Sequence, residues 1–337
     1  MNILVTGGAG FIGSNFIHYI LDKYPDYKVV NLDLLTYAGN LANLEAIIDD
    51  PRYTFVQGDI GDYALVKKIV RDHGVDAIIN FAAESHNSRA IVNPTIFFQT
   101  NVLGTQTLLE VARKNKVKRF HHISTCEVYG DLPLNSPEKF KEDSPLLPRT
   151  PYNASKAAAD LLVRAYYHTF QLPVTISNCS NNYGPYQFPE KLIPLFVTNL
   201  LENKSVPVYQ QSQNQREWIH VLDHCRAVDL ILHRGRLGET YNVGTGLEKS
   251  VEEITDFILQ ELEQPASMKN YVADRPGHDR RYLLDSTKIK RELSWQPEID
   301  FEDGLRQTIK WYKDHPDWWR PLKGRDNGVA ETNWSSR

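Results

Sequence analysis

A tyrosine and a lysine four positions apart are the first side chains in this sequence whose types and spacing indicate chemistry. Tyr152 and Lys156 stand in the stretch TPYNASKAAAD, and on a helix residues at this spacing point the same way. A phenol with a pKa of about 10 is a poor base at neutral pH, but a nearby ammonium group favours the phenolate. The pair predicts a base for a substrate hydroxyl, with the hydroxyl of Thr125 as a candidate partner on the same oxygen.

A thiol and a carboxylate follow Thr125 directly. Cys126 and Glu127 lie in ISTCEVYGDL, where an apolar run ends. A thiol with a pKa of about 8.5 is protonated at neutral pH. Cys126 is therefore either a core thiol at a strand end or a reactive group placed next to an acid. Glu127 is either that acid in a reactive pair or a salt-bridge residue at the same strand end.

A glycine motif predicts a dinucleotide site. The stretch ILVTGGAGFIGSN places Gly7, Gly10 and Gly13 between an apolar run and a helical pattern. Glycines there allow a tight turn and bring a pyrophosphate to the helix N-terminus. Asp33 follows at the end of the next apolar run, where a carboxylate binds ribose hydroxyls and repels a 2′-phosphate. The expected cofactor is NAD rather than NADP.

These motifs need a scaffold that brings several strand ends together. Short runs rich in Val, Ile and aromatic residues alternate with helical patterns through the first half of the chain. The predicted strands are NILVTG, YKVVNLD, YTFVQGDI, DAIINFAA and RFHHIST, and the predicted helices are FIGSNFIHYILDKY, YALVKKIVRDHG and TQTLLEVARKNK. This alternation predicts an α/β fold with a Rossmann-type, doubly wound parallel sheet.

The domain organisation follows from changes along the chain. The proline-rich segment 132–151 predicts a surface loop, because proline disfavours helix and sheet interiors. Beyond residue 179 the strict alternation fades. We expect residues 1–179 to form the NAD-binding domain, with return segments near 220–245. Residues 180–324 are expected to form a smaller C-terminal domain, and residues 325–337 a polar tail.

Composition narrows the classes of function. The 337 residues carry a formal net charge of −4, so the chain lacks the excess of basic residues that is typical of nucleic-acid-binding proteins. No apolar run reaches the roughly 20 residues of a membrane span, and the opening MNILVTGG is unlike a signal peptide. Three scattered cysteines indicate a reducing compartment, here the cytoplasm. No Cys/His cluster has a zinc-like spacing, so no metal is expected.

Taken together, the motifs resemble those of extended short-chain dehydrogenase/reductases that act on nucleotide sugars, and more narrowly the dTDP-glucose 4,6-dehydratase family. The matching stretches run nearly end to end. They are TGGAGFIGSN, LDLLTYAGNLANL, GDI, AAESH, YNASKAAADLLVRAY, NCSNNYGPYQFPEKLIP, REWIHVLDHCRA, ETYNVG and DRPGHDRRYLLD. The resemblance implies that the smaller domain binds a nucleotide sugar.

The resemblance implies a hydro-lyase that dehydrates dTDP-glucose and recycles NAD. Tyr152, with Lys156 and Thr125, would deprotonate the 4-hydroxyl as hydride leaves C4. Glu127 would then remove the C5 proton while an acid protonates the leaving 6-hydroxyl. Hydride return to C6 gives a 4-keto-6-deoxy nucleotide sugar.

The resemblance also implies the binding residues. Those expected at NAD are Gly7, Gly10, Phe11, Ile12, Gly13, Asp33, Leu34, Thr36, Asp59, Ile60, Ala82, Ala83, Thr100, Tyr152, Lys156 and Asn182. Those expected at the nucleotide sugar are Ser85, Thr125, Asn181, Lys191, Leu192, Pro207, Tyr209, Arg216, Asn242 and His278. A guanidinium suits a phosphate and an aromatic ring suits a base. A homodimer through the helices at about 101–115 and 152–168 is expected.

Two departures from the family pattern leave alternatives open. Cys126 stands where the family has an aspartate, and Asn87-Ser88 stand where it usually has Val-Asp. A thiol is protonated at neutral pH without any pKa shift, but it is a weaker acid than a carboxyl group. The gain in the protonated fraction and the loss in acid strength nearly cancel in the rate of proton transfer. We expect a working dehydratase with Cys126 as proton donor. The alternatives are a 5,6-dehydratase that yields a 5,6-ene sugar, a UDP-glucuronate decarboxylase, and a non-catalytic dinucleotide sensor.

Overall fold

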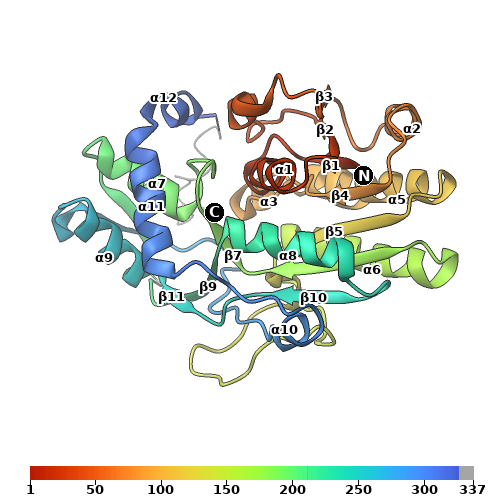
Figure 1. The fold of residues 1–337 in the computed structure, drawn as a ribbon. Helices are drawn as coiled ribbons and strands as arrows, with labels where there is room; N and C mark the ends of the chain where they lie inside the picture. The colour runs from red at the N-terminus through yellow and green to blue at the C-terminus, as the bar shows by residue number, and fades with distance from the viewer. Residues whose placement is uncertain (211, 326–337) are drawn as a thin grey trace.

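A parallel sheet is the centre of the computed structural model, which describes residues 1–210 and 212–325 (Figure 1). Among these residues it has seven strands in the order β10-β6-β5-β4-β1-β2-β3, and every pairing is parallel. The strands are β1 (Asn2–Thr6), β2 (Lys28–Asp33), β3 (Tyr53–Gln57), β4 (Ala77–Asn80), β5 (Arg119–Thr125), β6 (Val174–Cys179) and β10 (Thr240–Val243). The predicted doubly wound sheet is confirmed.

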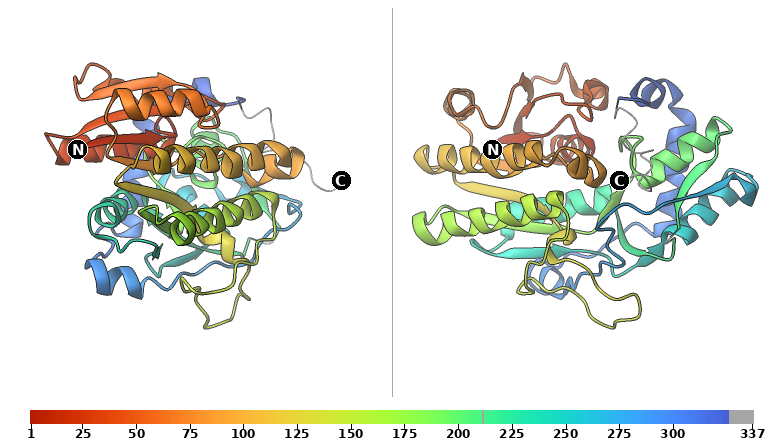
Figure 2. Two further views of the ribbon diagram at one scale, coloured as in Figure 1. Left: turned by 90° about the vertical axis from the view of Figure 1, so that its right-hand side faces the viewer. Right: turned by 180° about the vertical axis from the view of Figure 1, so that it is seen from behind.

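Helices cover both faces of this sheet, as the two further views show (Figure 2). One face packs on α1 (Phe11–Lys23) and α8 (Val221–Arg234) through a shared apolar core. The other face packs on α2 (Tyr63–Asp72), α5 (Thr105–Lys114) and α6 (Pro151–Phe170). The strands are buried from both sides, which explains their continuous apolar runs.

The helix that carries the predicted Tyr–Lys pair has a well-defined start. Thr150 caps α6, since its hydroxyl oxygen accepts a hydrogen bond from the backbone N–H of Asn153 at 3.2 Å. Pro151 occupies the first turn, where its missing N–H costs nothing. The helix ends at Phe170, and Gln171 follows with a φ of 55°. Tyr152 therefore lies in the first turn, directly beside the ends of the sheet strands.

A second lobe packs beside the carboxyl ends of the sheet and lies at the left of Figure 1. It contains one sheet of β7 (Asn181–Tyr183), β9 (Gln215–His220) and β11 (Glu248–Ser250), and a second of β8 (Val206–Tyr209) and β12 (Lys269–Val272). Its helices α7 (Leu192–Leu201), α9 (Val251–Glu261), α11 (Phe301–Asp314) and α12 (Pro316–Trp319) enclose a separate apolar core. α10 (Thr287–Leu293) packs instead against β10 and α8.

Short helices and a loop connect β4, β5 and α6. α3 (Asn87–Val92) and α4 (Pro94–Phe98) follow β4, and a π-helical segment, Gln99–Gly104, leads into α5. The sequence patterns did not predict these short helices. The predicted loop at 132–151 is confirmed up to its last residue, which opens α6. The predicted polar tail lies outside the described residues from position 326 onward.

Candidate active site

A cavity of about 320 Å³ lies at the carboxyl ends of the sheet strands, and we call it the cofactor cavity. The order of the strands reverses between β1 and β4, and open α/β sheets bind ligands at such a switch point. Every residue that the sequence predicts at NAD lines this cavity. These residues lie at or just after the ends of β1, β2, β3 and β4, or in α1, the segment Gln99–Gly104, α6 and β7.

The glycine turn after β1 fits a pyrophosphate. Gly7 has a φ of +69°, and a Cβ there would lie 2.6 Å from the backbone nitrogen of Ala82. Gly10 is the N-cap of α1 and leaves the helix without a side-chain cap. The backbone N–H groups of the first turn are therefore directed at the cavity, where the helix dipole favours an anion.

We expect Gly13→Ala to damage this turn. A Cβ at position 13 would lie 2.4 Å from the carbonyl oxygen of Gly7, closer than two such atoms can approach. We predict a destabilisation of about 1 to 3 kcal/mol together with weaker NAD binding. Thermal unfolding and a fluorescence titration with NAD measure the two effects. A variant with an unchanged melting temperature and unchanged NAD affinity would contradict this explanation of the glycine.

Asp33 lies at the end of β2 beside the glycine turn. Its Oδ2 accepts the backbone N–H of Ala9 at 2.9 Å, and its Oδ1 accepts that of Leu35 at 2.8 Å. Burial raises the pKa of this carboxyl group, and the two N–H donors oppose the rise. The donors thus hold a buried carboxylate at the wall of the cofactor cavity, a position that suits ribose hydroxyls and disfavours a 2′-phosphate.

Tyr152 and Lys156 both line the cofactor cavity from α6. Burial, then the nearby Glu127 carboxylate, raises the pKa of Tyr152 well above its ordinary value, and a hydrogen bond with Thr125 opposes the rise. Lys156 directs Nζ to the carbonyl oxygen of Ile123 at 2.6 Å, and burial lowers the pKa of its ammonium group to about 8. The prediction that Lys156 lowers the pKa of Tyr152 is therefore wrong in its net direction, because burial and the Glu127 carboxylate raise that pKa.

A larger cavity of about 930 Å³ continues into the second lobe, and we call it the nucleotide cavity. Glu127 lines both cavities and so marks the place where they join. Its backbone N–H donates to the Thr125 hydroxyl oxygen at 3.3 Å. Within the part of the chain that the structure describes, Glu127 makes no ion pair, which does not support the salt-bridge alternative. A base at this junction can reach a sugar whose oxidised carbon faces Tyr152.

Most residues that the sequence predicts at the nucleotide sugar line the nucleotide cavity. They are Ser85, Asn181, Lys191, Leu192, Pro207, Tyr209, Arg216 and His278. Thr125 lines the cofactor cavity instead. The guanidinium of Arg216 donates to the carbonyl oxygens of Gln215 and Asp279, both at 2.7 Å, and this fixes the cation in the cavity wall.

The far end of the nucleotide cavity has an aromatic wall. The rings of Tyr209 and His278 meet edge to face with centroids 5.1 Å apart. Burial, with Arg275 and Arg216 nearby, lowers the pKa of His278 to about 2. A neutral imidazole and a phenol ring beside Pro207 form a surface on which a flat base can stack.

Asn242 is not at the site, contrary to the prediction from the resemblance. Its Oδ1 accepts the hydroxyl proton of Tyr129 at 2.9 Å, and its Nδ2 donates to the carbonyl oxygen of Phe140 at 2.9 Å. The side chain is fully buried and lines neither cavity. Asn242 therefore holds the segment 129–140 against β10.

Cys126 lies directly beneath the junction of the cavities. It belongs to a buried cluster with Tyr129, Ala157 and Tyr282 and is 1% exposed, and it is not among the residues that line either cavity. Burial, then the adjacent Glu127, raises the pKa of the thiol well above its ordinary value. The thiol is therefore protonated at working pH, as expected, but it is a weaker acid than an exposed cysteine.

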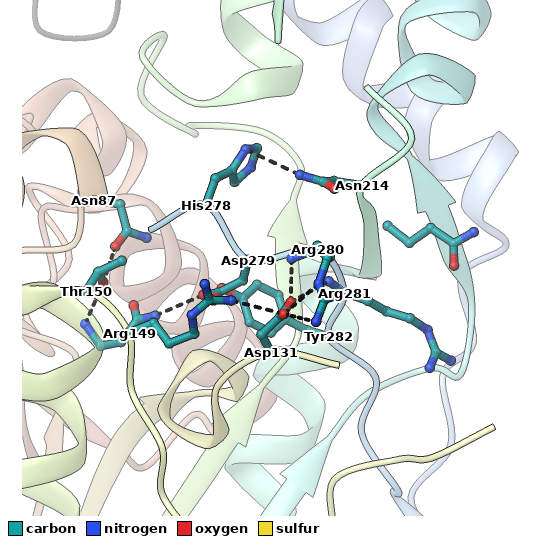
Figure 3. A network of polar contacts seen from close by, with 12 residues as sticks. Asn87, Asp131, Arg149, Thr150, Asn214, His278, Asp279, Arg280, Arg281 and Tyr282 are labelled. Carbon is teal, nitrogen blue, oxygen red and sulfur yellow. Dashed lines mark hydrogen bonds and ion pairs between the residues drawn. The ribbon is translucent and has the colours of Figure 1, made fainter. Parts of the chain in front are cut away.

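A polar network lies beside the nucleotide cavity, next to its lining residues His278 and Tyr282 (Figure 3). Arg149 bridges Asp131 and Asp279 at 3.0 and 3.3 Å. Arg280 pairs with the same Asp131 at 2.6 Å. The network joins the proline-rich loop before α6 to the segment 279–282, and so fixes the entry of α6.

Several residues that the sequence did not assign also line the nucleotide cavity, among them Arg275, Tyr282 and Asn87. The first two lie in the quoted stretch DRPGHDRRYLLD, which was a usable signal. Asn87 has no sequence signal other than its departure from the family pattern.

Two further observations concern metals and membranes. Among residues 1–210 and 212–325, no group of three or more His, Cys, Asp and Glu side chains is arranged to hold a metal ion. No helix in those same ranges combines the length and apolarity needed to cross a membrane.

Comparison with known proteins agrees with this geometry. The family model described as GDP-mannose 4,6 dehydratase matches residues 4–308. The chain is 48% identical to a dTDP-glucose 4,6-dehydratase of Streptomyces niveus and 46% identical to one of Shigella flexneri, each over 100% of both chains. A crystal structure of a dTDP-glucose 4,6-dehydratase from Streptomyces venezuelae with NAD and TYD bound is 52% identical. It has a TM-score of 0.93 and covers 96% of this chain and 100% of its own.

Proposed function

This chain belongs to the dTDP-glucose 4,6-dehydratase family, and from that premise we infer that it dehydrates dTDP-glucose to the 4-keto-6-deoxy nucleotide sugar in an NAD-dependent reaction. The single observation that carries this function is the position of Glu127 at the junction of the two cavities. Oxidation at C4 alone needs only the Tyr152 end of the site. Elimination needs a second base, and Glu127 is placed to supply it.

Tyr152 and Thr125 serve the first step. NAD, when bound, supplies a carrier that takes the hydride of C4 and later returns it to C6. Tyr152 takes the proton of the 4-hydroxyl, and the hydroxyl of Thr125 holds the same oxygen. Lys156 adds positive charge on the same helix face, which favours the phenolate that Tyr152 must form.

Glu127 serves the second step. The new C4 ketone acidifies the C5 proton, and Glu127 removes it. The C6–O bond breaks, the hydroxyl leaves with one added proton as water, and a C5–C6 double bond forms. After hydride reaches C6, Glu127 returns its proton to C5. The 4-hydroxyl proton taken by Tyr152 balances the proton that leaves in water.

For the proton of the leaving water we propose Cys126. It stands between Thr125 and Glu127 and carries a protonated thiol whose pKa burial raises further. Its side chain lines neither cavity, so this role requires the thiol to turn toward the substrate. A thiolate formed there is restored by the proton that Tyr152 holds. Tyr282 packs against Cys126 and lines the nucleotide cavity, so it is the competing donor.

We expect Cys126→Ala to slow elimination about 10²-fold, the usual range for a lost general acid, while oxidation at C4 continues. Cys126→Asp is expected to restore elimination, because aspartate is the residue that the family carries at this position. Single-turnover kinetics with dTDP-glucose measure both steps. Elimination at the native rate in Cys126→Ala, with a loss in Tyr282→Phe, would assign the donor role to Tyr282.

Incubation with candidate substrates tests the function. We expect dTDP-glucose to give a product with a C6 methyl doublet beside a C4 ketone in the NMR spectrum. UDP-glucose and UDP-N-acetylglucosamine are the comparison substrates for nucleotide and sugar preference, and UDP-glucuronate tests the decarboxylase alternative. An exocyclic alkene would assign the chain to the 5,6-dehydratases. Loss of carbon dioxide from UDP-glucuronate would assign it to the decarboxylases. If no sugar gives a product, the non-catalytic dinucleotide sensor is the alternative that fits.

Three broader proposals accompany this function. We propose that residues 1–179, with the return near 220–245, form the NAD-binding domain, and that residues 180–324 bind the nucleotide sugar. We propose a homodimer through the helical segments at about 101–115 and 152–168, supported by the exposed side chains Leu103 (61%) in the π-helical segment and Leu161 (56%) in α6. Light scattering in solution measures the oligomeric state.

We propose a cytoplasmic location, because three free cysteines suit a reducing compartment.

A further inference from the structure

Asn87 makes the side-chain contact to the second base of the site. It opens α3, it is 8% exposed, and it lines the nucleotide cavity. Its Nδ2 donates to Oε2 of Glu127 at 2.8 Å. Its Oδ1 accepts the hydroxyl proton of Thr150 at 2.6 Å, and Figure 3 shows this second contact.

The partners of the amide allow only one orientation. The hydroxyl of Thr150 accepts the backbone N–H of Asn153 at 3.2 Å and still has its proton to donate. A carboxylate has no proton to give and accepts only. The oxygen of the Asn87 amide must therefore face Thr150, and its NH₂ group must face Glu127.

The amide is a neutral hydrogen-bond donor to the Glu127 carboxylate. Burial, and then Glu127, raises the pKa of the neighbours Cys126, Tyr152 and Tyr282, and the Arg216 guanidinium lowers the pKa of Cys126 and Tyr282. A hydrogen bond from a neutral amide to a carboxylate is charge-assisted and stronger than a neutral pair. Asn87 thus gives Glu127 a short, directional hydrogen bond at 2.8 Å.

We propose that Asn87 is a positioning residue for the elimination step. It holds Oε2 of Glu127 and so directs Oε1 to the C5 proton. Through Thr150 it also ties Glu127 to the first turn of α6, where Tyr152 lies. The base for C5 and the base for the 4-hydroxyl therefore keep a fixed separation. This inference rests on the proposed dehydratase function.

The test separates elimination from oxidation in the NAD-loaded enzyme. Absorbance at about 340 nm reports oxidation at C4, and solvent deuterium incorporation reports removal of the C5 proton. In Asn87→Ala we expect C5 exchange to slow about 10-fold to 100-fold, the range for one charge-assisted hydrogen bond, with oxidation within about twofold of native. Reduced cofactor then accumulates. The melting temperature reports any general damage to the fold.

Two more variants keep the test decisive. Asn87→Asp has almost the same shape but turns a donor into a carboxylate that faces Glu127, so it should slow C5 exchange more than Asn87→Ala does. Asn93→Ala removes an exposed asparagine at the other end of α3 and should match the native enzyme in every assay.

Specific outcomes would overturn the inference. Native C5 exchange in Asn87→Ala or in Asn87→Asp would remove the positioning role. An equal loss of oxidation and exchange, with a lowered melting temperature, would reduce Asn87 to a structural residue. A native enzyme that makes no 4-keto-6-deoxy sugar at all would instead remove the proposed function on which this inference rests.

Discussion

Replacing Glu127 with Gln is expected to lower turnover of dTDP-glucose by about 10²-fold to 10⁴-fold, the range for loss of a general base. Glutamine keeps the shape of the side chain and can still accept from Nδ2 of Asn87, which now donates to Oε2 at 2.8 Å. It cannot take the C5 proton. Oxidation at C4 does not use Glu127, so absorbance at about 340 nm should rise once with substrate and stay high.

A matched control is Glu138→Gln in the exposed part of the 132–151 loop, which should leave every rate unchanged. Two results would contradict the role of Glu127. The first is full turnover in Glu127→Gln. The second is a correctly folded variant that loses both the absorbance change and turnover. Glu127 acts only after oxidation at C4, so removing it should not prevent that oxidation.

Replacing Tyr152 with Phe is expected to lower turnover by a similar factor of about 10²-fold to 10⁴-fold, but with a different signature. Tyr152 lines the cofactor cavity and acts on the 4-hydroxyl. Without it oxidation does not begin, and no absorbance change should follow the addition of substrate. Tyr152→Phe is therefore expected to stop the reaction before the C4 ketone forms, and Glu127→Gln after it forms.

The matched control for this variant is Tyr166→Phe on the same helix. The hydroxyl of Tyr166 donates to Glu110 at 3.4 Å, and Tyr166 lines neither cavity. Turnover in Tyr166→Phe should equal that of the native enzyme. An absorbance change of native size in Tyr152→Phe would show that another group takes the 4-hydroxyl proton.

The sheet and the cofactor cavity were predictable because their signals are local. Each strand is a short apolar run, and the glycine turn, Asp33 and the Tyr–Lys pair lie at strand ends or helix starts that the alternation defines. Parallel strands bring all these ends to one edge. The residues that these motifs predict at NAD line one cavity, and so do those that the family resemblance adds.

Contacts between distant segments were not predictable in the same way. Asn87 meets Glu127 across 40 positions and Thr150 across 63, and no spacing rule joins such residues. Asn242 was placed at the substrate by resemblance, yet its strand β10 turns its amide toward Tyr129 and Phe140. The direction of the pKa shift at Tyr152 was also not predictable, because it depends on burial and on charged groups from several elements.

The central claim is that hydride leaves C4 and returns to C6 on one sugar. The most direct measurement uses dTDP-glucose that carries deuterium at C4, with the product examined by NMR and mass spectrometry. We predict a 4-keto-6-deoxy product with one deuterium in its C6 methyl group and none lost to solvent. Deuterium found again at C4 beside a 5,6-alkene, or a methyl group without deuterium, would contradict this account.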